Sequence, residues 1–354
     1  MSSDSGRRDA TRHSHARLGA VLTMITIMAV TGATACTAMR HNKTHDAAPL
    51  QKNYERTIAK ALPSVVEIRA GRATGSGVVY DGRGDIVTNA HVVGTVKKFQ
   101  VRVSIASTPM KARLVGVFTP DDLAVIRVLK GAGALRPVHW ANSAKVQVGA
   151  IVLAMGSPLG LTDSVTQGIV SATGRTVTGP TIPGHPPTVI ENAIQTSAPI
   201  NPGNSGGALV LLSGNVLGIP TLTAQDPALP GPAQGIGFAI PSNTVRDISR
   251  QLIRSGRVTR SDRASLQIRG ETHVNSSGKP DGVTVDAAEP GGAAAKAGIR
   301  PGNVIVGING QATPGIAELE NALIAFNPGE RITVEVLRNG NPREVVATLG
   351  SLRS

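Results

Sequence analysis

Short apolar stretches that end in glycine-rich turns run through the middle of the chain, and they limit what it can fold into. Residues 65–69, 77–80 and 86–88 are such stretches, with a Gly/Asp-rich turn at residues 81–84. Strands at this spacing, with no long helix between them, are typical of barrels of antiparallel sheet. Aromatic residues make up only 2% of the chain, so Val, Ile, Leu and Ala must form its core. We therefore expect a mainly β protein built around two β-barrels.

The pattern changes after the last of these strands. Residues 242–255 have the apolar spacing of a helix, with Ser242, Asn243 and Thr244 as candidate N-caps and Gly256 as a C-terminal stop. Beyond a polar linker, short strands alternate with short helices, the second of which is expected over residues 316–326. The sequence therefore predicts a barrel domain over residues 58–256, a linker over residues 257–264 and a small α/β domain over residues 265–352.

The first 57 residues differ from the rest of the chain. Residues 1–17 are basic, and residues 18–39 carry no charge over a length that can span a bilayer. Positive charge before such a segment keeps the N-terminus in the cytoplasm and places the rest of the chain outside. We expect residues 18–39 to be a transmembrane anchor or a signal segment that meets the membrane, and residues 40–57 to be a stalk.

Cys36 leaves the fate of this segment open. It is the only cysteine, so no disulfide can form within the chain. The small residues before it are similar to a bacterial lipoprotein cleavage site, although Ala33 stands where a larger aliphatic residue is usual. A cleaved signal, a lipid anchor at Cys36 and an uncleaved helix are the alternatives, and we favour the uncleaved anchor. Each places the barrels outside the cytoplasm of a bacterial cell, on its periplasmic or extracellular side.

The net charge of +13 raises the question of nucleic-acid binding. Seven Lys or Arg residues lie in the first 52 residues and five Arg residues between residues 246 and 261, while residues 262–354 are close to neutral. The chain has no zinc-finger, helix-turn-helix or aromatic RNA-binding signature. Nucleic acid is therefore not an expected partner, and anionic lipid or cell-wall polymer fits the N-terminal charges better. No metal and no organic cofactor are expected.

Ser205 lies among three glycines in the sequence Asn-Pro-Gly-Asn-Ser-Gly-Gly-Ala-Leu, residues 201–209. Glycines allow backbone angles that let successive N–H groups turn toward one point. A hydroxyl beside such N–H groups matches a nucleophile with an oxyanion hole, as acyl transfer requires. Gly203 and Ser205 would supply the N–H groups, and Asn204 would shape the turn. The stretch by itself could also be a plain turn between strands, so a base and an acid must be found elsewhere.

Both occur earlier in the chain. His91 follows the strand expected at residues 86–88, and Asp121 and Asp122 precede another apolar strand. The order His, Asp, Ser is that of chymotrypsin-type enzymes, whereas subtilisin-type enzymes and α/β-hydrolases have other orders. Adjacent residues of a strand point to opposite faces, so only one of the two aspartates can reach His91. The sequence therefore predicts a catalytic triad of His91, one of these aspartates and Ser205.

Residues 88–93, 122–125 and 200–209 together resemble the three triad motifs of the HtrA/Deg family of PDZ-bearing serine proteases. Supporting matches lie at residues 156–160 and 235–241, and the similarity extends from about residue 62 to residue 349. The resemblance implies a chymotrypsin-like double β-barrel and assigns the acid to Asp122, which leaves Asp121 as a surface turn residue. It also implies a serine endopeptidase in quality control of unfolded or damaged proteins. Relatives are commonly trimers, so a homotrimer is one expected assembly.

The C-terminal α/β domain resembles a PDZ domain, which binds an extended peptide as an added strand. Relatives carry an aromatic-Leu-Gly-Ile loop that cradles a peptide carboxylate. This chain has Ser265, Leu266, Gln267 and Ile268 at those positions. Glutamine in place of glycine should restrict the backbone of the loop. We therefore expect weak binding of hydrophobic C-terminal peptides.

Two other functions are weighed against proteolysis. A protein-binding scaffold or chaperone with little proteolysis would use the same peptide-binding domain but would not need all three triad groups. A lipase or esterase would need the Gly-x-Ser-x-Gly elbow and a different triad order. For a protease, cleavage is expected after small or medium aliphatic residues, because no Asp or Glu lies between residues 193 and 212 to neutralise a buried Lys or Arg.

Overall fold

A computed structural model describes residues 47–103, 108–157, 164–178, 188–201, 203–225 and 232–353. Residues 1–56 and residues 57–354 form two separate units and are described one by one. The expected membrane segment at residues 18–39, with Cys36, lies outside the described residues. No helix in the described part of the chain is both long enough and apolar enough to cross a membrane.

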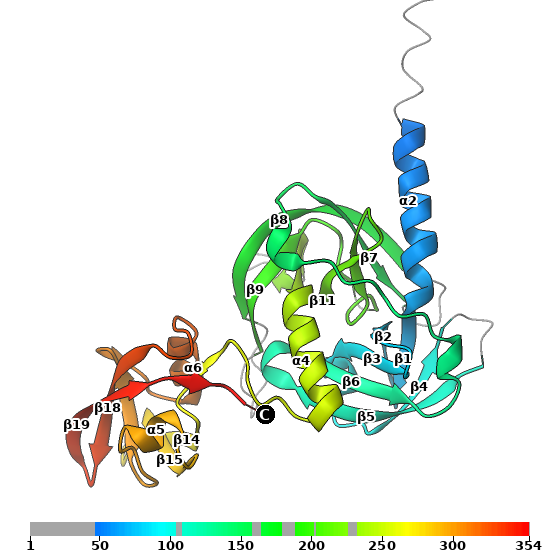
Figure 1. Ribbon diagram of the computed structural model, residues 1–354. Coiled ribbons are helices and arrows are strands. Elements are labelled where there is room, and N and C mark those ends of the chain that lie inside the picture. Colours follow the sequence, from blue (N-terminus) through cyan, green and yellow to red (C-terminus); the bar gives the residue numbers. More distant parts are fainter. Residues whose placement is uncertain are drawn as a thin grey trace, which may run out of the picture. The chain divides into compact units, whose positions relative to one another are not determined.

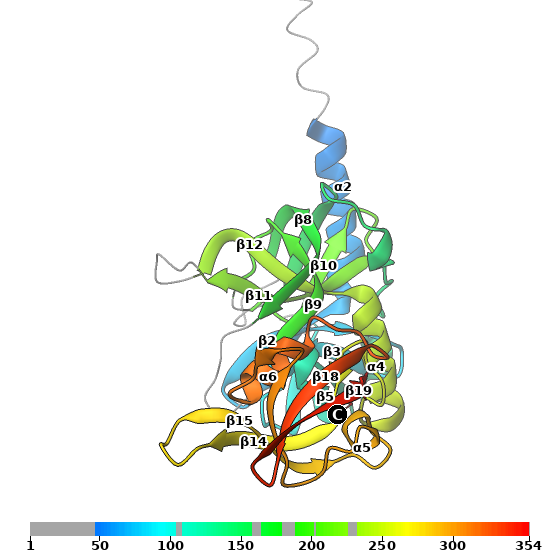
Figure 2. The same cartoon turned by 90° about the vertical axis from the view of Figure 1, so that its left-hand side faces the viewer.

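The first β-barrel is a closed antiparallel sheet of six strands in the order β1-β2-β3-β6-β5-β4. Its strands are β1 (Val65–Ala70), β2 (Ala73–Val79), β3 (Asp85–Asn89), β4 (Lys98–Arg102), β5 (Met110–Phe118) and β6 (Leu123–Val128). Aliphatic side chains such as Ile68, Ile86 and Ile126 fill its interior, as the scarcity of aromatic residues requires. The barrel is drawn in blue to cyan in Figures 1 and 2.

The second β-barrel is also closed, with the strand order β10-β11-β12-β9-β8-β7. Its strands are β7 (Ile151–Gly156), β8 (Ser164–Thr178), β9 (Val189–Thr196), β10 (Ala208–Leu211), β11 (Val216–Gln225) and β12 (Pro232–Pro241). Buried Val152, Ile194 and Leu217 belong to its core. The two barrels predicted from the strand spacing are therefore confirmed.

One helix packs against both barrels. Helix α4 (Ser242–Ser255) contacts β5 and β6 of the first barrel and β11 and β12 of the second (Figure 1). Its buried face carries Val245, Ile248 and Leu252, and the N–H of Gly256 donates to the Leu252 carbonyl at 2.8 Å. The expected Ser242 cap is wrong, because the Ser242 hydroxyl donates to the Ala141 carbonyl instead, at 2.9 Å.

Short helical elements join the strands. They are η1 (Leu62–Ser64), α3 (Ala90–Val93), η2 (Thr119–Asp121), η3 (Ala132–Ala134) and η4 (Ser143–Lys145). Two of them matter for the site, because α3 follows β3 directly and η2 directly precedes Asp122 and β6.

The C-terminal domain is a small α/β fold, as predicted. Its main sheet has the order β14-β15-β16-β18-β19, with β17 paired to β16, and β13 pairs with β20. The elements are β13 (Ala264–Ser265), β14 (Ile268–Val274), β15 (Pro280–Ala288), α5 (Ala293–Lys296), β16 (Val304–Ile308), β17 (Gln311–Ala312), α6 (Ile316–Leu323), β18 (Arg331–Arg338), β19 (Asn341–Thr348) and β20 (Gly350–Ser351). Helix α6 ends at Leu323, three residues earlier than the sequence suggested.

Helix α2 (Ala47–Ala61) occupies much of the segment for which a stalk was expected. The Thr57 hydroxyl donates to the Leu212 carbonyl, and the Lys60 ammonium donates to the Ser213 carbonyl, both at 2.8 Å. These bonds attach the end of the helix to the turn after β10. The segment expected as a stalk, residues 40–57, is helical from Ala47 onward, and its first residues lie outside the described part of the chain. This attachment has little signature in the sequence, because the bonding partners lie about 150 residues away.

Candidate active site

Strand pairing brings His91 and Asp122 together. Asn89, at the end of β3, lies opposite Leu123, the first residue of β6. Helix α3 after β3 carries His91, and Asp122 immediately precedes β6 in a left-handed conformation with φ 51°. His91 Nδ1 lies 2.8 Å from Asp122 Oδ2, and the His91 backbone N–H donates to Asp122 Oδ1 at 3.0 Å. One carboxylate thus fixes both the backbone and the ring of the histidine.

The Asp122 carboxylate is 3% exposed and receives a further hydrogen bond from outside its own barrel. The hydroxyl of Thr221, in β11, donates to Asp122 Oδ2. The Asn89 side-chain amide and the Ala90 N–H both donate to the Asp122 carbonyl at 3.0 Å. A buried carboxylate needs donors such as the His91 N–H and the Thr221 hydroxyl, because its desolvation without them costs several kcal/mol. The sequence interpretation missed Thr221, which no local motif distinguishes.

The environment of His91 shifts its titration. Burial of the ring by itself would lower the pKa of His91, but the hydrogen bond and the charge of Asp122 raise it. The net result is a pKa above the ordinary value of 6.5. A histidine in this setting is stabilised as an imidazolium, the form that a general base takes after it accepts a proton.

Asp121 does not have the surroundings that were expected for it. It is 6% exposed, so its prediction as a surface turn residue is wrong. Its Oδ1 lies 3.5 Å from Nη1 of Arg263, whose Nε lies 3.5 Å from Glu191 Oε1. Burial outweighs this guanidinium and raises the pKa of Asp121 to about 7. The structure therefore directs Asp121 toward Arg263 and Asp122 toward His91.

Asn204 holds the turn that carries Ser205. It is 3% exposed, and its N–H donates to the Asn201 carbonyl at 3.2 Å. Its Oδ1 accepts the Asn201 N–H at 3.0 Å, and its Nδ2 donates to the Pro199 carbonyl at 3.2 Å. The prediction that Asn204 shapes the turn agrees with this geometry.

Gly206 allows the turn to approach the strand that leads to His91. It has φ +80°, and a Cβ there would lie 2.3 Å from the Ser76 carbonyl oxygen and 2.5 Å from Thr88 Oγ1. Only glycine tolerates both the backbone conformation and the lack of space. The Ser205 turn of the second barrel is therefore in contact with β2 and β3 of the first. Among the described residues, no hydrogen bond joins the Ser205 hydroxyl to the His91 ring; such bonds often tighten only with substrate present.

Ser76, in β2, forms hydrogen bonds to the same turn. The sequence interpretation missed this residue. Its hydroxyl donates to the Gly203 carbonyl and accepts the Ser157 N–H at 2.8 Å. Its own N–H donates to the Ser205 carbonyl at 3.1 Å. Ser76 is fully buried, so these bonds are shielded from water. The side chain of Ser76 thus holds the Gly203 carbonyl and its backbone N–H holds the Ser205 carbonyl, on the two sides of Asn204.

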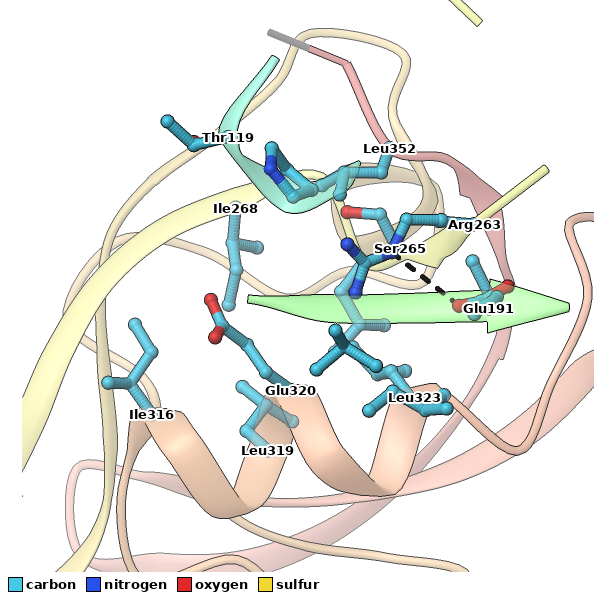
Figure 3. Close-up of a pocket in the computed structure, with 15 residues that line it drawn as sticks. Thr119, Glu191, Arg263, Ser265, Ile268, Ile316, Leu319, Glu320, Leu323 and Leu352 are labelled. Atoms are coloured by element: carbon cyan, nitrogen blue, oxygen red, sulfur yellow. Dashed lines mark ion pairs between the residues drawn. The ribbon is translucent and has the colours of Figure 1, made fainter. Parts of the chain in front are cut away.

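A pocket in the C-terminal domain lies along β14 and α6, where Figure 3 shows Ile268, Ile316, Leu319 and Leu323 around it. The lining also includes Glu320 and Arg263. Thr119, Pro120, Val189 and Glu191 of the protease domain line the pocket as well, and Figure 3 draws the Arg263–Glu191 ion pair as a dashed line. Apolar walls with few charges are typical of sites that hold aliphatic side chains. Ser265 ends β13, Ile268 begins β14, and Leu266 and Gln267 connect the two strands; Ser265, Leu266 and Ile268 line this pocket.

Gln267 has a backbone conformation that favours glycine. Its φ is +58°, in the left-handed region, and its side chain is buried. Gln267 Oε1 accepts the Ala293 N–H at 3.0 Å, and Nε2 donates to the Ser351 carbonyl at 3.3 Å. The substitution of glycine therefore leaves the left-handed conformation in place, because side-chain hydrogen bonds hold it.

Comparison with known proteins gives results for both domains. The family described as "Trypsin-like peptidase domain" matches residues 75–219, and the family "PDZ domain" matches residues 257–349. The chain is 36% identical over 287 residues to the periplasmic pH-dependent serine endoprotease DegQ of Escherichia coli (strain K12), covering 79% of this chain and 60% of that protein. It is 37% identical over 273 residues to the periplasmic serine endoprotease DegP of the same organism, covering 76% of this chain and 55% of that protein. The chain thus spans a little over half the length of these curated relatives.

Solved structures cover the similarity more completely. A serine endoprotease from Yersinia pestis has 34% identity and a TM-score of 0.54, covering 84% of this chain and 98% of that one. The HtrA-type protease AlgW with a tripeptide has 32% identity and the same TM-score, covering 84% of this chain and 96% of that one.

Proposed function

The chain belongs to the HtrA family of trypsin-like, PDZ-containing serine proteases, and from that premise we propose that it is a serine endopeptidase with the triad His91, Asp122 and Ser205. The observation that carries the proposal is the doubly hydrogen-bonded pair of His91 and Asp122. The Ser205 turn packs against the strand that leads to this histidine, through the close approach at Gly206.

The proposed reaction assigns a role to each group. His91 takes the proton of the Ser205 hydroxyl as Oγ attacks the scissile carbonyl, and then gives it to the leaving amine. Asp122 accepts the hydrogen bond from Nδ1–H, which fixes the tautomer of His91 and stabilises the imidazolium. A water molecule then hydrolyses the acyl-enzyme by the same steps. The raised pKa of His91 is consistent with this role, since the site favours its protonated form.

The backbone N–H groups of Gly203 and Ser205 would stabilise the oxyanion. Such donors are effective because they are already oriented when charge develops on the carbonyl oxygen. Asn204 and Ser76 supply this orientation through their bonds to the turn. For the residue before the cleaved bond, we propose a small or medium aliphatic side chain, because residues 193–212 provide no carboxylate to pair with a basic one.

We further propose that the protein acts outside the cytoplasm on unfolded or damaged proteins. Two curated relatives are named periplasmic serine endoproteases, which supports the compartment. The PDZ domain supports recognition of protein chains beyond the cleaved bond. We also propose membrane retention through residues 18–39, with lipidation at Cys36 or a cleaved signal as the alternatives, and assembly as a homotrimer. Mass spectrometry of the mature N-terminus and sedimentation of the purified protein test them separately.

A labelling assay tests the enzyme against a scaffold. Wild-type protein should react with a fluorophosphonate probe at Ser205 and cleave unfolded casein, and Ser205→Ala should do neither while unfolding at the same temperature. The neighbouring aspartates are a matched pair: Asp122→Asn should reduce kcat by about 10⁴-fold, and Asp121→Asn should change it by less than about tenfold. An unlabelled wild-type protein would support a scaffold, and the reverse effect of the two aspartates would exchange their roles.

A further inference from the structure

The pocket along β14 and α6, called the groove below, could bind the C-terminus of a protein chain or an internal segment of it. In an added-strand complex, the N–H groups of the loop at residues 265–268 would face the end of the bound peptide. A loop that captures a C-terminal carboxylate needs those N–H groups free, since a carboxylate has only acceptor oxygens. Two features of this groove oppose such capture.

The first feature is an internal acceptor on the loop. The Ser265 hydroxyl oxygen accepts the Gln267 N–H at 2.9 Å. Ser265 is mostly buried, so the bond is not readily exchanged for one with water. A carboxylate that used the Gln267 N–H would have to displace this hydroxyl. Neutral hydrogen bonds of this kind correspond to a factor of about 2 to 10 in an equilibrium constant.

The loop is also held in this arrangement from behind. The Gln267 side chain bonds to the Ala293 N–H at the start of α5 and to the Ser351 carbonyl in β20. A Cβ on Gly350 would lie 2.4 Å from Gln267 Oε1, so the amide is closely packed against β20. Opening the loop to release the Ser265 bond would therefore disturb two further elements.

The second feature is the charge of the groove. Glu320, on α6, lines the pocket beside Leu319 and Leu323 (Figure 3). Burial raises the pKa of Glu320, and the charge of Arg263 opposes this shift. When it is ionised, its carboxylate would repel a terminal carboxylate and would not repel an amide carbonyl. Arg263 also lines the pocket; its Nε lies 3.5 Å from Glu191, and its buried Nη1, 3.5 Å from Asp121, has no hydrogen-bond partner among the described residues.

We propose that this groove takes an internal, uncharged apolar segment of a protein chain as an added strand beside β14, in preference to a free C-terminal carboxylate. Ile268, Ile316, Leu319 and Leu323 provide the apolar walls for alternate aliphatic side chains of that segment. The inference deepens the protein recognition proposed above and rests on the PDZ assignment, not on the protease chemistry. It gives the enzyme access to unfolded chains whose termini are not exposed.

The test uses the full chain as Ser205→Ala, so that peptides are not cut. Three fluorescein-labelled probes share one apolar hexapeptide of Ala, Val and Leu: one ends in a carboxylate, one ends in a carboxamide, and one has amidated Gly-Ser flanks on both sides. Fluorescence anisotropy should give dissociation constants for the carboxamide and flanked probes that are at most about twofold higher than that of the carboxylate probe. Tenfold tighter binding of the carboxylate, or no binding of any probe at about 1 mM, overturns the proposal.

Substitutions then test the two causes. Ser265→Ala and Glu320→Gln should each shift the ratio of carboxylate to carboxamide affinity toward the carboxylate, by about 2- to 10-fold. Ser261→Ala is the control for the first, because it removes a buried hydroxyl that donates to the Leu352 carbonyl at 2.9 Å. Glu318→Gln is the control for the second, on the exposed side of the same helix.

The ratio reports selectivity even if overall affinity falls, because both probes would weaken together. Ser265 and Glu320 lie on different elements. If one variant fails to fold, the affinity ratio of the other variant still tests the proposal. A ratio that stays at its wild-type value in every folded variant overturns the inference. Casein cleavage by the protein with Ser205 intact is read separately, so failure of the proposed protease function would be recognised as such.

Discussion

Asp121 and Asp122 are neighbours in the chain, but their carboxylates lie in different surroundings. Asp122 accepts hydrogen bonds from His91 and Thr221, and Asp121 lies buried near Arg263 and the like charges of Glu191 and Asp262. The left-handed backbone at Asp122 contributes to this separation, because it reverses the chain between η2 and β6. The proposed triad acid, Asp122, thus accepts several hydrogen bonds, whereas burial of the neighbouring Asp121 carries an energetic cost that depends on pH.

That cost gives a prediction about stability. The pKa of Asp121 is about 7 in the folded protein and near 3.8 in the unfolded chain, so the folded state holds a proton that the unfolded state releases between these values. The contribution of Asp121 to the free energy of unfolding is therefore greatest below about pH 4 and is lost as the pH rises through 7. The loss is at most about 4 kcal/mol, from 1.36 kcal/mol for each pKa unit.

Urea unfolding at pH 4.5 and pH 8 measures this effect. Asp121→Asn should lose less stability than wild type between the two pH values, and it should be the more stable protein at pH 8. Asp286→Asn, an exposed aspartate in β15 of the C-terminal domain, is the control and should follow wild type. An identical pH dependence of wild type and Asp121→Asn would show that Asp121 is ionised in the folded protein.

His91 gives a prediction about the pH dependence of activity. A general base must be neutral to accept the Ser205 proton, so kcat/KM should rise with pH through the pKa of His91 in the free enzyme. Because Asp122 raises that pKa above 6.5, the midpoint of the rise should lie above 6.5. Asp122→Asn should move the midpoint of the residual activity downward, because burial of the ring then acts without the opposing charge. A midpoint that stays in place would contradict the role of Asp122.

At the scale of the elements, β2 does more than complete the first barrel. The Ser76 hydroxyl donates to the Gly203 carbonyl and accepts the N–H of Ser157 after β7. The Ser76 backbone N–H donates to the Ser205 carbonyl. A strand of one barrel therefore positions the turn that carries the nucleophile of the other. The expected oxyanion donors depend on a residue that lies 127 positions away in the chain.

Ser76→Ala should test this dependence. Loss of one direct oxyanion donor typically costs 10²- to 10³-fold in kcat, and Ser76 acts only through the turn, so we expect a loss of about tenfold with KM little changed. Ser242→Ala is the matched control, because it also removes a buried hydroxyl that donates to a backbone carbonyl, far from the triad. Steady-state kinetics on a peptide should separate the two. Equal losses of kcat in both variants would indicate a general effect on stability.

The sequence predicted what is encoded locally. Strand alternation and glycine-rich turns were enough for both barrels, and the His, Asp and Ser motifs each lie in one short stretch. Thr221, Ser76 and the burial of Asp121 were not predictable in this way, because each depends on a partner more than 90 residues away. A buried polar side chain leaves no periodic signal, so its role emerges only when the fold brings its partner close.

At the scale of the protease domain, the proposed active site is divided between two barrels, so contact between them is a condition for activity. The chain's only tryptophan reports on that contact. Trp140 pairs with Val216 of β11, and its ring centroid lies 6.0 Å from that of Tyr80, which follows β2. Its fluorescence should therefore change when the barrels separate.

Helix α4 gives a way to weaken this contact. Leu252 is fully buried where α4 packs against the barrels, and a Cβ on Gly116 of β5 would lie 3.0 Å from Leu252 Cδ2. Leu252→Ala leaves a cavity there and should lower the free energy of unfolding by about 2–5 kcal/mol. Arg250→Ala, on the exposed face of the same helix, is the control and should stay close to wild type. Trp140 fluorescence and peptide cleavage, followed together in increasing urea, should be lost in one transition at a lower midpoint in Leu252→Ala. If cleavage persisted after the fluorescence had changed, the two barrels would not need to stay in contact, and the division of the triad between them would have to be reconsidered.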